Sequence, residues 1–154
     1  MSRAWRFGAI LLLAGCTQAT APVKPLLDGE PPKPDGMFKM VESPEVATYF
    51  AAKSVGLYQG NPHLRQFYLI NNYSAAARKD VGEPSIYSSR ALMVINCERD
   101  ESARFGRTYF SKPYAEGVEI ASKDETPQWK EFPRQSITGH LRDLTCALDP
   151  SRLR

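Results

Sequence analysis

The fold is decided by the stretch Ile86–Cys97, which reads IYSSRALMVINC. Its second half holds the apolar run Leu92–Ile95, flanked by Arg90 and Asn96. A short apolar run bounded by turn-forming sequences is typical of a strand in the interior of a sheet. A turn-rich loop, Ala75–Pro84, precedes this strand and a charged turn, Glu98–Glu101, follows it. The chain is therefore predicted to reverse direction on both sides of the stretch.

Further strand-like stretches lie on both sides of this one. Upstream, Leu64–Tyr73 alternates, with Phe67 and Leu69 on one face and Tyr68 and Ile70 on the other. Because the connections are short, antiparallel meander pairing is the natural topology. The remaining predicted strands are Met37–Val41, Val46–Leu57, Ala103–Phe110 and Val118–Ala121.

The C-terminal part carries a helical pattern instead. Within Ser136–Leu148, apolar residues recur as on one face of an amphipathic helix, namely Ile137, Leu141, Leu144 and Leu148. Ser136 can cap the helix and Pro150 can end it, whereas Gly139 costs about 1 kcal/mol relative to alanine. The predicted class is α+β: a single antiparallel sheet of about five to six strands with a C-terminal helix packed on one face.

The N-terminus has the pattern of a bacterial export signal. Arg3 and Arg6 precede an apolar run that ends in the tetrapeptide LAGC at Cys16. The run is shorter than the roughly 20 residues that span a bilayer, and its ending matches a lipobox, where cysteine directly follows the cleavage site. We predict a lipoprotein signal peptide over 1–15 and a lipid on Cys16. Thr17, in place of aspartate, favours the outer membrane; the alternative is a secreted protein with a chance cysteine.

A proline-rich segment separates Cys16 from the predicted domain. Residues 16–36 hold five prolines and show no helical or alternating apolar pattern. Such a segment favours extended polyproline II structure. At about 3.1 Å per residue it could hold the domain up to roughly 60 Å from the bilayer. We predict a tether here and a folded domain over 37–150; the alternative is that Leu26 and Leu27 dock onto the domain.

Two cysteines, Cys97 and Cys146, remain once Cys16 carries lipid. An even pair in an oxidising compartment favours one disulfide, which would tie the central strand to the C-terminal helix. On an ideal helix Cys146 points nearly opposite the apolar stripe, so the bridge would need a distorted helix end or a helix flanked on both sides. The rival interpretation is a reactive thiol with His140 as its base, but residues six apart do not share a helical face.

The sequence holds no pattern for catalysis, cofactor binding or metal binding. His63 and His140 are far apart, and no HExxH, CxxC, GxSxG or glycine-rich phosphate loop occurs. Adjacent carboxylates, Asp100-Glu101 and Asp124-Glu125, are predicted in solvated turns. The 154 residues carry a formal net charge of +3 without a basic cluster, which argues against nucleic-acid binding. We therefore expect neither an enzyme nor a cofactor.

Aromatic and basic residues indicate that the domain works by contact. A sheet covered by one helix leaves its other face exposed, and tyrosine and arginine are enriched at protein interfaces. The alternative is that the aromatic rings only fill the core. The candidate binding face, which could also join two copies of the chain as a homodimer, consists of Arg65, Tyr68, Arg90, Arg104 and Arg107.

Several spaced motifs follow the central strand in a distinctive order. They are Ile95-Asn96-Cys97, Tyr109-Phe110, Gly117, Trp129, Pro133, Ser136 and Leu144-Thr145-Cys146-Ala147. Together with the lipoprotein signal, this order resembles the surface-adhesin protein E family of Gram-negative outer-membrane lipoproteins, over roughly Gly36–Leu148. The resemblance implies an antiparallel sheet with a C-terminal helix held to it by the Cys97–Cys146 disulfide. It also implies that Trp129 packs as a lid before the helix.

The same resemblance carries an expectation about function. The founding adhesin of the family is displayed outside the cell, can dimerise through its sheet and binds host extracellular-matrix proteins. We therefore expect a lipid-anchored adhesin of the outer membrane that uses the sheet face or the Ala75–Pro84 loop, although no motif for matrix binding is present. The alternative is a periplasm-facing accessory lipoprotein that binds an envelope complex or the cell wall.

Overall fold

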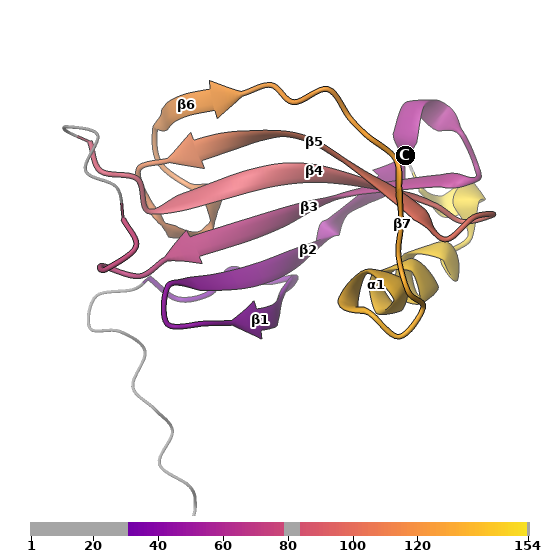
Figure 1. The fold of residues 1–154 in the computed structure, drawn as a ribbon, viewed down its shortest axis with the longest axis horizontal. Coiled ribbons are helices and arrows are strands. Elements are labelled where there is room, and N and C mark those ends of the chain that lie inside the picture. The colour runs from indigo at the N-terminus through magenta and orange to yellow at the C-terminus, as the bar shows by residue number, and fades with distance from the viewer. Residues whose placement is uncertain (1–30, 79–83, 154) are drawn as a thin grey trace, which may run out of the picture.

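The computed structural model describes residues 31–78 and 84–153, so Cys16, the predicted signal peptide and most of the predicted tether lie outside it. One antiparallel sheet dominates the domain (Figure 1). Each strand pairs with the next in sequence, which confirms the predicted meander. The strands are β1 (Met37–Glu42), β2 (Val46–Leu57), β3 (Leu64–Tyr73), β4 (Ser88–Asn96), β5 (Glu101–Phe110) and β6 (Glu119–Lys123).

A seventh strand was not predicted. The two-residue strand β7 (Lys130–Glu131) pairs with the beginning of β5, while β6 pairs with the end of β5. Short 3-10 helices lie at three turns: η1 (Tyr58–Gly60), η2 (Pro113–Ala115) and η3 (Pro150–Arg152). The stretch that decides the fold forms β4, which lies between β3 and β5 and buries Val94 and Ile95 completely.

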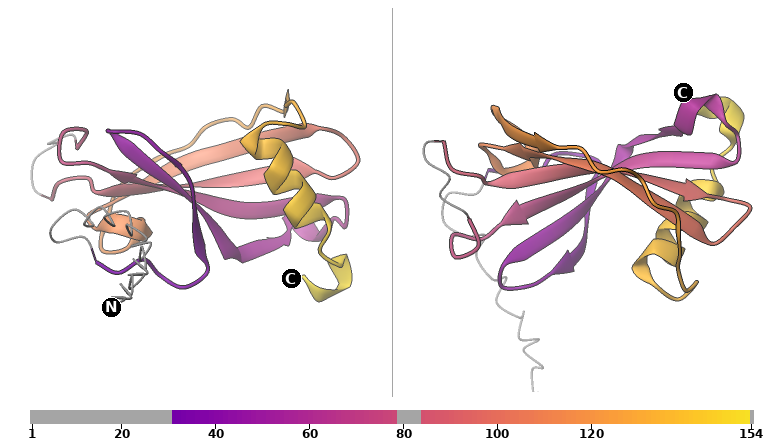
Figure 2. Two further views of the ribbon diagram at one scale, coloured as in Figure 1. Left: turned by 90° about the horizontal axis from the view of Figure 1, so that it is seen from below. Right: turned by 45° about the horizontal axis from the view of Figure 1, so that its top comes forward.

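The two faces of the sheet are covered at opposite ends. The helix face, which we define by Phe67, Leu69, Ala91 and Met93, carries the C-terminal helix over its Phe67 end. The opposite face, which includes Tyr68 and the residues aligned with it across the strands, carries η2 at the other end. Figure 2 shows the helix and η2 at opposite ends of the sheet. Neither face is therefore wholly open, contrary to the expectation of one covered and one exposed face.

Each covered end has its own small core. Under the helix, Phe50, Phe67 and Ile95 pack against Leu141, with the Phe50 and Phe67 rings edge to face at 5.2 Å. On the opposite face, Tyr114 of η2 packs edge to face on Tyr49, with ring centroids 5.3 Å apart, beside Ala51 and Ile70. Such aromatic pairs stabilise by about 0.5–1.5 kcal/mol beyond the area they bury. Each core covers one end of its face and leaves the rest of that face open.

The helix α1 (Ile137–Cys146) begins where the sequence predicts. The Ser136 hydroxyl accepts a hydrogen bond from the Gly139 N–H at 3.2 Å and so caps the first turn.

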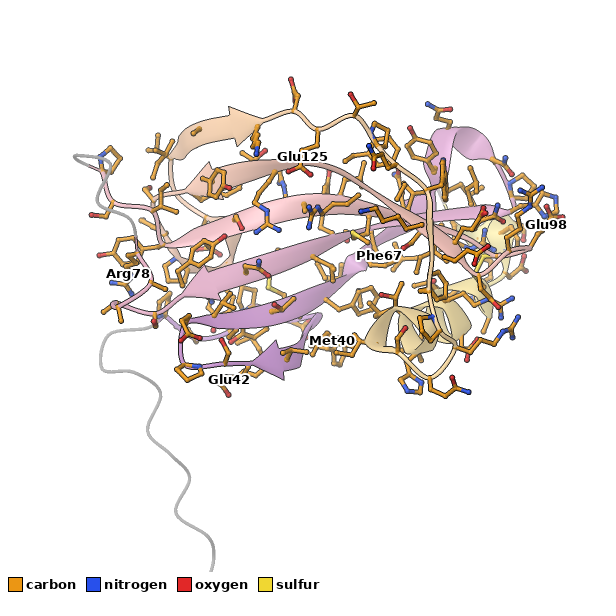
Figure 3. The ribbon with its side chains drawn as sticks, viewed as in Figure 1. Met40, Glu42, Phe67, Arg78, Glu98 and Glu125 are labelled. Atoms are coloured by element: carbon orange, nitrogen blue, oxygen red, sulfur yellow. A yellow bond between two sulfur atoms is a disulfide. The ribbon has the colours of Figure 1, made fainter. Side chains whose placement is uncertain are left out.

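Within the described residues, no helix combines the length and apolarity needed to cross a membrane. Figure 3 shows Phe67 and Met40 beside α1, and Met40 packs against the core under the helix.

The predicted apolar stripe of the helix is wrong as a buried face. Leu141 alone of the four is buried, at 2% exposure, whereas Ile137, Leu144 and Leu148 are 45%, 61% and 43% exposed. The helix is rotated so that Leu141, Thr145 and Cys146 approach the sheet. The Thr145 hydroxyl is satisfied there by donating to the Leu141 carbonyl oxygen at 2.8 Å.

The disulfide explains this rotation. Cys97, directly after β4, is bonded to Cys146, with the two Cα atoms 5.7 Å apart. The bridge confirms the predicted pairing and excludes a free thiol at either position. Because Cys146 must face the sheet, the stripe nearly opposite to it on the helix turns towards solvent. Only Leu141, at the edge of this stripe, stays buried against the sheet.

Gly139 is required by close packing and not merely tolerated. A Cβ atom at this position would overlap the carbonyl group of Arg134 in the segment before the helix. We therefore expect Gly139→Ala to lower the free energy of unfolding by about 2 kcal/mol, because overpacking outweighs the roughly 1 kcal/mol gain in helix propensity. Urea unfolding measures this change. The matched control His140→Ala, at an exposed position of the same helix, should change stability by less than about 0.5 kcal/mol, and an equally neutral Gly139→Ala would contradict the prediction.

Candidate functional site

A groove of about 560 Å³ lies on the open part of the helix face. Its floor is formed by Leu69, Ala91 and Met93 from neighbouring strands. Its wall is the segment 124–130, which runs from β6 to β7 along the β5 side of the sheet. Glu125 of this segment lies at the upper side of the molecule in Figure 3. The floor is apolar and the rim is polar, as in sites that bind a ligand by contact.

Arg107 is held in this groove by hydroxyl groups. Its Nη1 donates to the Tyr73 Oη at 3.2 Å and to the Ser89 Oγ at 3.3 Å. These two hydroxyl oxygens are themselves 2.7 Å apart and share a hydrogen bond. Ser89 is buried, so the network rests on a fixed part of the sheet. The guanidinium is therefore positioned without a charged partner in the network.

Arg104 lies in the same groove and does have a charged partner. Its Nη2 and Nε donate to one carboxylate oxygen of Glu125, at 3.3 and 3.4 Å. The pair is partly exposed, so its net contribution to stability lies within about 1 kcal/mol. It joins the segment 124–130 to β5 where no strand pairing is present between β6 and β7.

A second groove, of about 430 Å³, lies on the opposite face. Tyr68, Leu92 and Phe105 line it and are aligned across three strands. Arg90 covers this alignment, with its guanidinium carbon 4.7 Å from the Tyr68 ring centroid and 5.2 Å from that of Phe110. These distances are within cation–π range, so Arg90 is also held by neutral groups.

The two grooves meet at a bulge in β5. Gly106 has a φ of +47°, and a Cβ atom there would lie 2.9 Å from the Lys123 carbonyl oxygen, so glycine is needed. The register of β5 against β4 shifts at the same place, between Arg90 and Leu92. Arg107 and Glu125 line both grooves as a result.

The five residues of the predicted binding face do not share one surface. Tyr68 and Arg90 lie in the opposite-face groove, and Arg104 and Arg107 lie in the helix-face groove. Arg65 is buried at 2% exposure. Side chains alternate between the faces along each strand, and the sequence alone did not set the register that separates these arginines. The predicted face is therefore divided between two grooves that adjoin at Arg107, and Arg65 lines neither of them.

Arg65 instead fixes the end of the helix. Its Nε donates to the Thr145 carbonyl at 3.2 Å, its Nη2 to the Leu148 carbonyl at 3.2 Å and its Nη1 to the Pro62 carbonyl at 2.6 Å. Burial lowers the pKa of the Arg65 guanidinium. The backbone carbonyls at a helix end are otherwise without partners, so Arg65 satisfies them and connects β3 to the C-terminal segment.

Asp100 was predicted in a solvated turn, but it binds two arginines. Arg134 Nε donates to its Oδ2 at 2.8 Å, and Arg142 Nε lies 3.8 Å from its Oδ1. The hydrogen bond to Asp100 raises the pKa of Arg134. Arg142 also donates to the Cys97 carbonyl at 2.8 Å. This cluster holds the segment before α1, and α1 itself, on the β4–β5 turn; no local sequence pattern indicates it.

Trp129 and the Ala75–Pro84 loop were the two other features for which the sequence carried an expectation. Trp129 is 43% exposed and does not act as a lid; Phe132, three residues later, packs against the core under the helix. In the Ala75–Pro84 loop, residues 79–83 lie outside the described residues. Nearby, the Arg78 guanidinium carbon lies 3.8 Å from the Tyr87 ring centroid.

The arrangement of both grooves is suited to binding by contact. His63 pairs with Glu98, with Nδ1 and Oε1 3.2 Å apart, and is far in sequence from the exposed His140. No group of three histidine, cysteine or carboxylate side chains that could hold a metal occurs among the described residues. Both grooves place arginine donors beside aromatic or apolar side chains, with further polar and charged groups at their rims.

Comparisons with known proteins agree with this fold. A family model described as surface-adhesin protein E matches residues 38–147. A structure of Haemophilus influenzae protein E is similar, with a TM-score of 0.63 and 14% identity over 81% of this chain and 95% of that chain. Its selenomethionine form has a TM-score of 0.62 and 15% identity, over 75% of this chain and 89% of that chain. Protein E from a non-typeable strain of the same species has a TM-score of 0.60 and 14% identity, over 79% of this chain and 82% of that chain.

At these identities the likeness to solved structures establishes the fold alone. A comparison with curated proteins found no match to the sequence. The family model covers most of the described domain.

Proposed function

The chain belongs to the surface-adhesin protein E family, and from this premise we propose that it is a lipid-anchored protein of the outer membrane that contacts host extracellular-matrix proteins. Membership of this adhesin family supports a location at the cell surface and a role as a binding protein that is not an enzyme. The lipid anchor on Cys16 is supported by the lipobox ending at that residue, and the proline-rich segment 16–36 would carry the domain away from the membrane.

One observation carries the binding proposal. Each open part of the sheet presents an arginine that neutral groups hold in place: Arg107 by two hydroxyls and Arg90 by two aromatic rings. Arginines with spare donors over an apolar surface are frequent anchors of protein interfaces. Both grooves are therefore suited to a protein partner.

Charge reversal in the opposite-face groove tests this proposal. We expect Arg90→Glu to weaken binding of the purified full chain to immobilised host matrix proteins at least tenfold, because a carboxylate repels the acidic groups that the arginine would pair with. The matched control is Arg99→Glu, at an exposed position of the β4–β5 turn. Unchanged binding by folded Arg90→Glu would remove this groove from the proposal.

The orientation of the domain needs a separate measurement. Protease treatment of intact cells, followed by detection of the domain, distinguishes the two sides of the outer membrane. Digestion without membrane disruption is expected. Digestion only after the outer membrane has been opened would favour the second candidate, a periplasm-facing accessory lipoprotein that binds an envelope complex or the cell wall. The tether supports that candidate equally well.

A further inference from the structure

The helix-face groove has more positive than negative charge at its rim. Arg104, Arg107 and Lys130 line it, against the single carboxylate of Glu125. The Glu125 carboxylate forms an ion pair with Arg104. Among residues 31–78 and 84–153, no carboxylate lies within ion-pair distance of Arg107. The groove therefore has an unmatched cation in a fixed position.

Arg107 is oriented for a ligand. Only its Nη1 is used by Tyr73 and Ser89; in the described part of the chain its Nε and Nη2 donate to nothing. A planar guanidinium with two spare donors matches a carboxylate, which accepts two parallel hydrogen bonds. Because the hydroxyl network fixes the side chain beforehand, a ligand loses less binding energy in ordering it.

Glu125 shows what kind of group fits. It belongs to the segment 124–130, which forms the wall of the groove, and places a carboxylate on Arg104 of the neighbouring strand β5. The Arg104–Glu125 pair is thus an internal example of the contact that Arg107 lacks. An incoming carboxylate would bind Arg107 and compete with Glu125 for Arg104.

We propose that the helix-face groove binds an acidic peptide segment, with Arg107 as its anchor and Glu125 as a built-in competitor. The apolar floor of Leu69, Ala91 and Met93 accepts an apolar side chain beside the acidic one. A sulfated polysaccharide fits less well, because such chains need an extended basic surface and this rim holds only three cations. The inference rests on the proposed binding function and names the ligand chemistry for one of its two grooves.

Fluorescence anisotropy with defined peptides tests the proposal on the purified full chain. The probe is a labelled octapeptide in which aspartates alternate with leucines; the control probe has asparagine in place of each aspartate. We expect the aspartate probe to bind and the asparagine probe to bind at least tenfold more weakly. Arg107→Gln should weaken binding of the aspartate probe about tenfold. The control Arg99→Gln, outside the groove, should leave it unchanged.

Glu125→Gln separates the proposed role from a structural one. If Glu125 competes for Arg104, its removal should tighten binding of the aspartate probe about threefold, whereas a merely structural Glu125 would give weaker binding when removed. Equal binding of the two probes, equal effects of Arg107→Gln and Arg99→Gln, weaker binding by Glu125→Gln, or binding of a sulfated oligosaccharide in place of the peptide would each overturn the proposal.

The same variants distinguish this inference from the proposed function. If the wild-type chain binds matrix proteins but binds the aspartate and asparagine probes equally, the peptide site fails while the adhesin function stands. If the aspartate probe behaves as expected and no matrix protein binds, the adhesin function fails while the groove remains a peptide site.

Discussion

Replacing Cys97 and Cys146 together by serine is expected to lower the free energy of unfolding by about 4 kcal/mol. The bridge closes a loop with a sequence separation of 49 residues, and a loop of about this length restricts the unfolded chain by roughly that amount. The helix depends on the bridge more than on its own packing, because Leu141 is the single fully buried apolar side chain on it. Urea unfolding followed by circular dichroism measures the loss.

The order of events in that experiment is informative. Without the bridge, α1 should lose its signal at lower urea than the sheet does, since the six-strand meander is held by its own ladders. The control is the wild-type chain treated with reductant, which should behave like the double variant. An unchanged midpoint for the double variant would show that contacts of Arg65 and Leu141 are sufficient to hold the helix.

Arg65→Met is expected to lower the free energy of unfolding by about 3 kcal/mol, the second largest effect. Methionine fills part of the space but leaves the Thr145, Leu148 and Pro62 carbonyls without their donor. Each buried acceptor that loses its partner costs about 1–3 kcal/mol, while burying methionine in place of a desolvated cation offsets part of the loss. Urea unfolding at neutral pH gives the difference directly.

Two further variants make this result interpretable. Arg65→Lys should recover only part of the stability, because one ammonium group cannot reach three carbonyls in different directions. Arg104→Met, at an exposed arginine on the same face, should change stability by less than about 1 kcal/mol. If Arg65→Met were as stable as the wild type, the buried guanidinium would be compensated by packing alone, as in other buried ionic clusters.

The strands could be predicted from the sequence because each has its own local signal. β3 begins and ends where the alternation does, β2 coincides with the predicted stretch Val46–Leu57, and the apolar run of β4 lies at the centre of the sheet. β7 could not be predicted, because two residues carry no periodicity and pair only through the tertiary fold. The helix was found by its cap at Ser136, but its orientation was not, since the disulfide and Arg65 decide which side meets the sheet.

The sequence predicted several residues that line the candidate site but not how these residues are arranged on the sheet. The sequence identifies arginines near tyrosines, and four of the five chosen residues do line grooves. The position of Arg107 between the two grooves depends on the register shift at Gly106, which no local pattern reveals. Glu125 was predicted in a solvated turn because its partner, Arg104, is brought to it only by the folded segment 124–130.

The position of α1 at the end of the chain sets an order in time. In the proposed export across the inner membrane the chain emerges N-terminus first, so each strand can pair as soon as its neighbour in sequence has emerged and the sheet can grow strand by strand from β1. The cover for Phe67 and Ile95 is among the last segments to appear. A chain that has emerged as far as the end of β6 therefore carries a finished core on one face of the sheet and exposed apolar side chains on the other. The oxidation of Cys97 must wait for Cys146, which emerges 49 residues later.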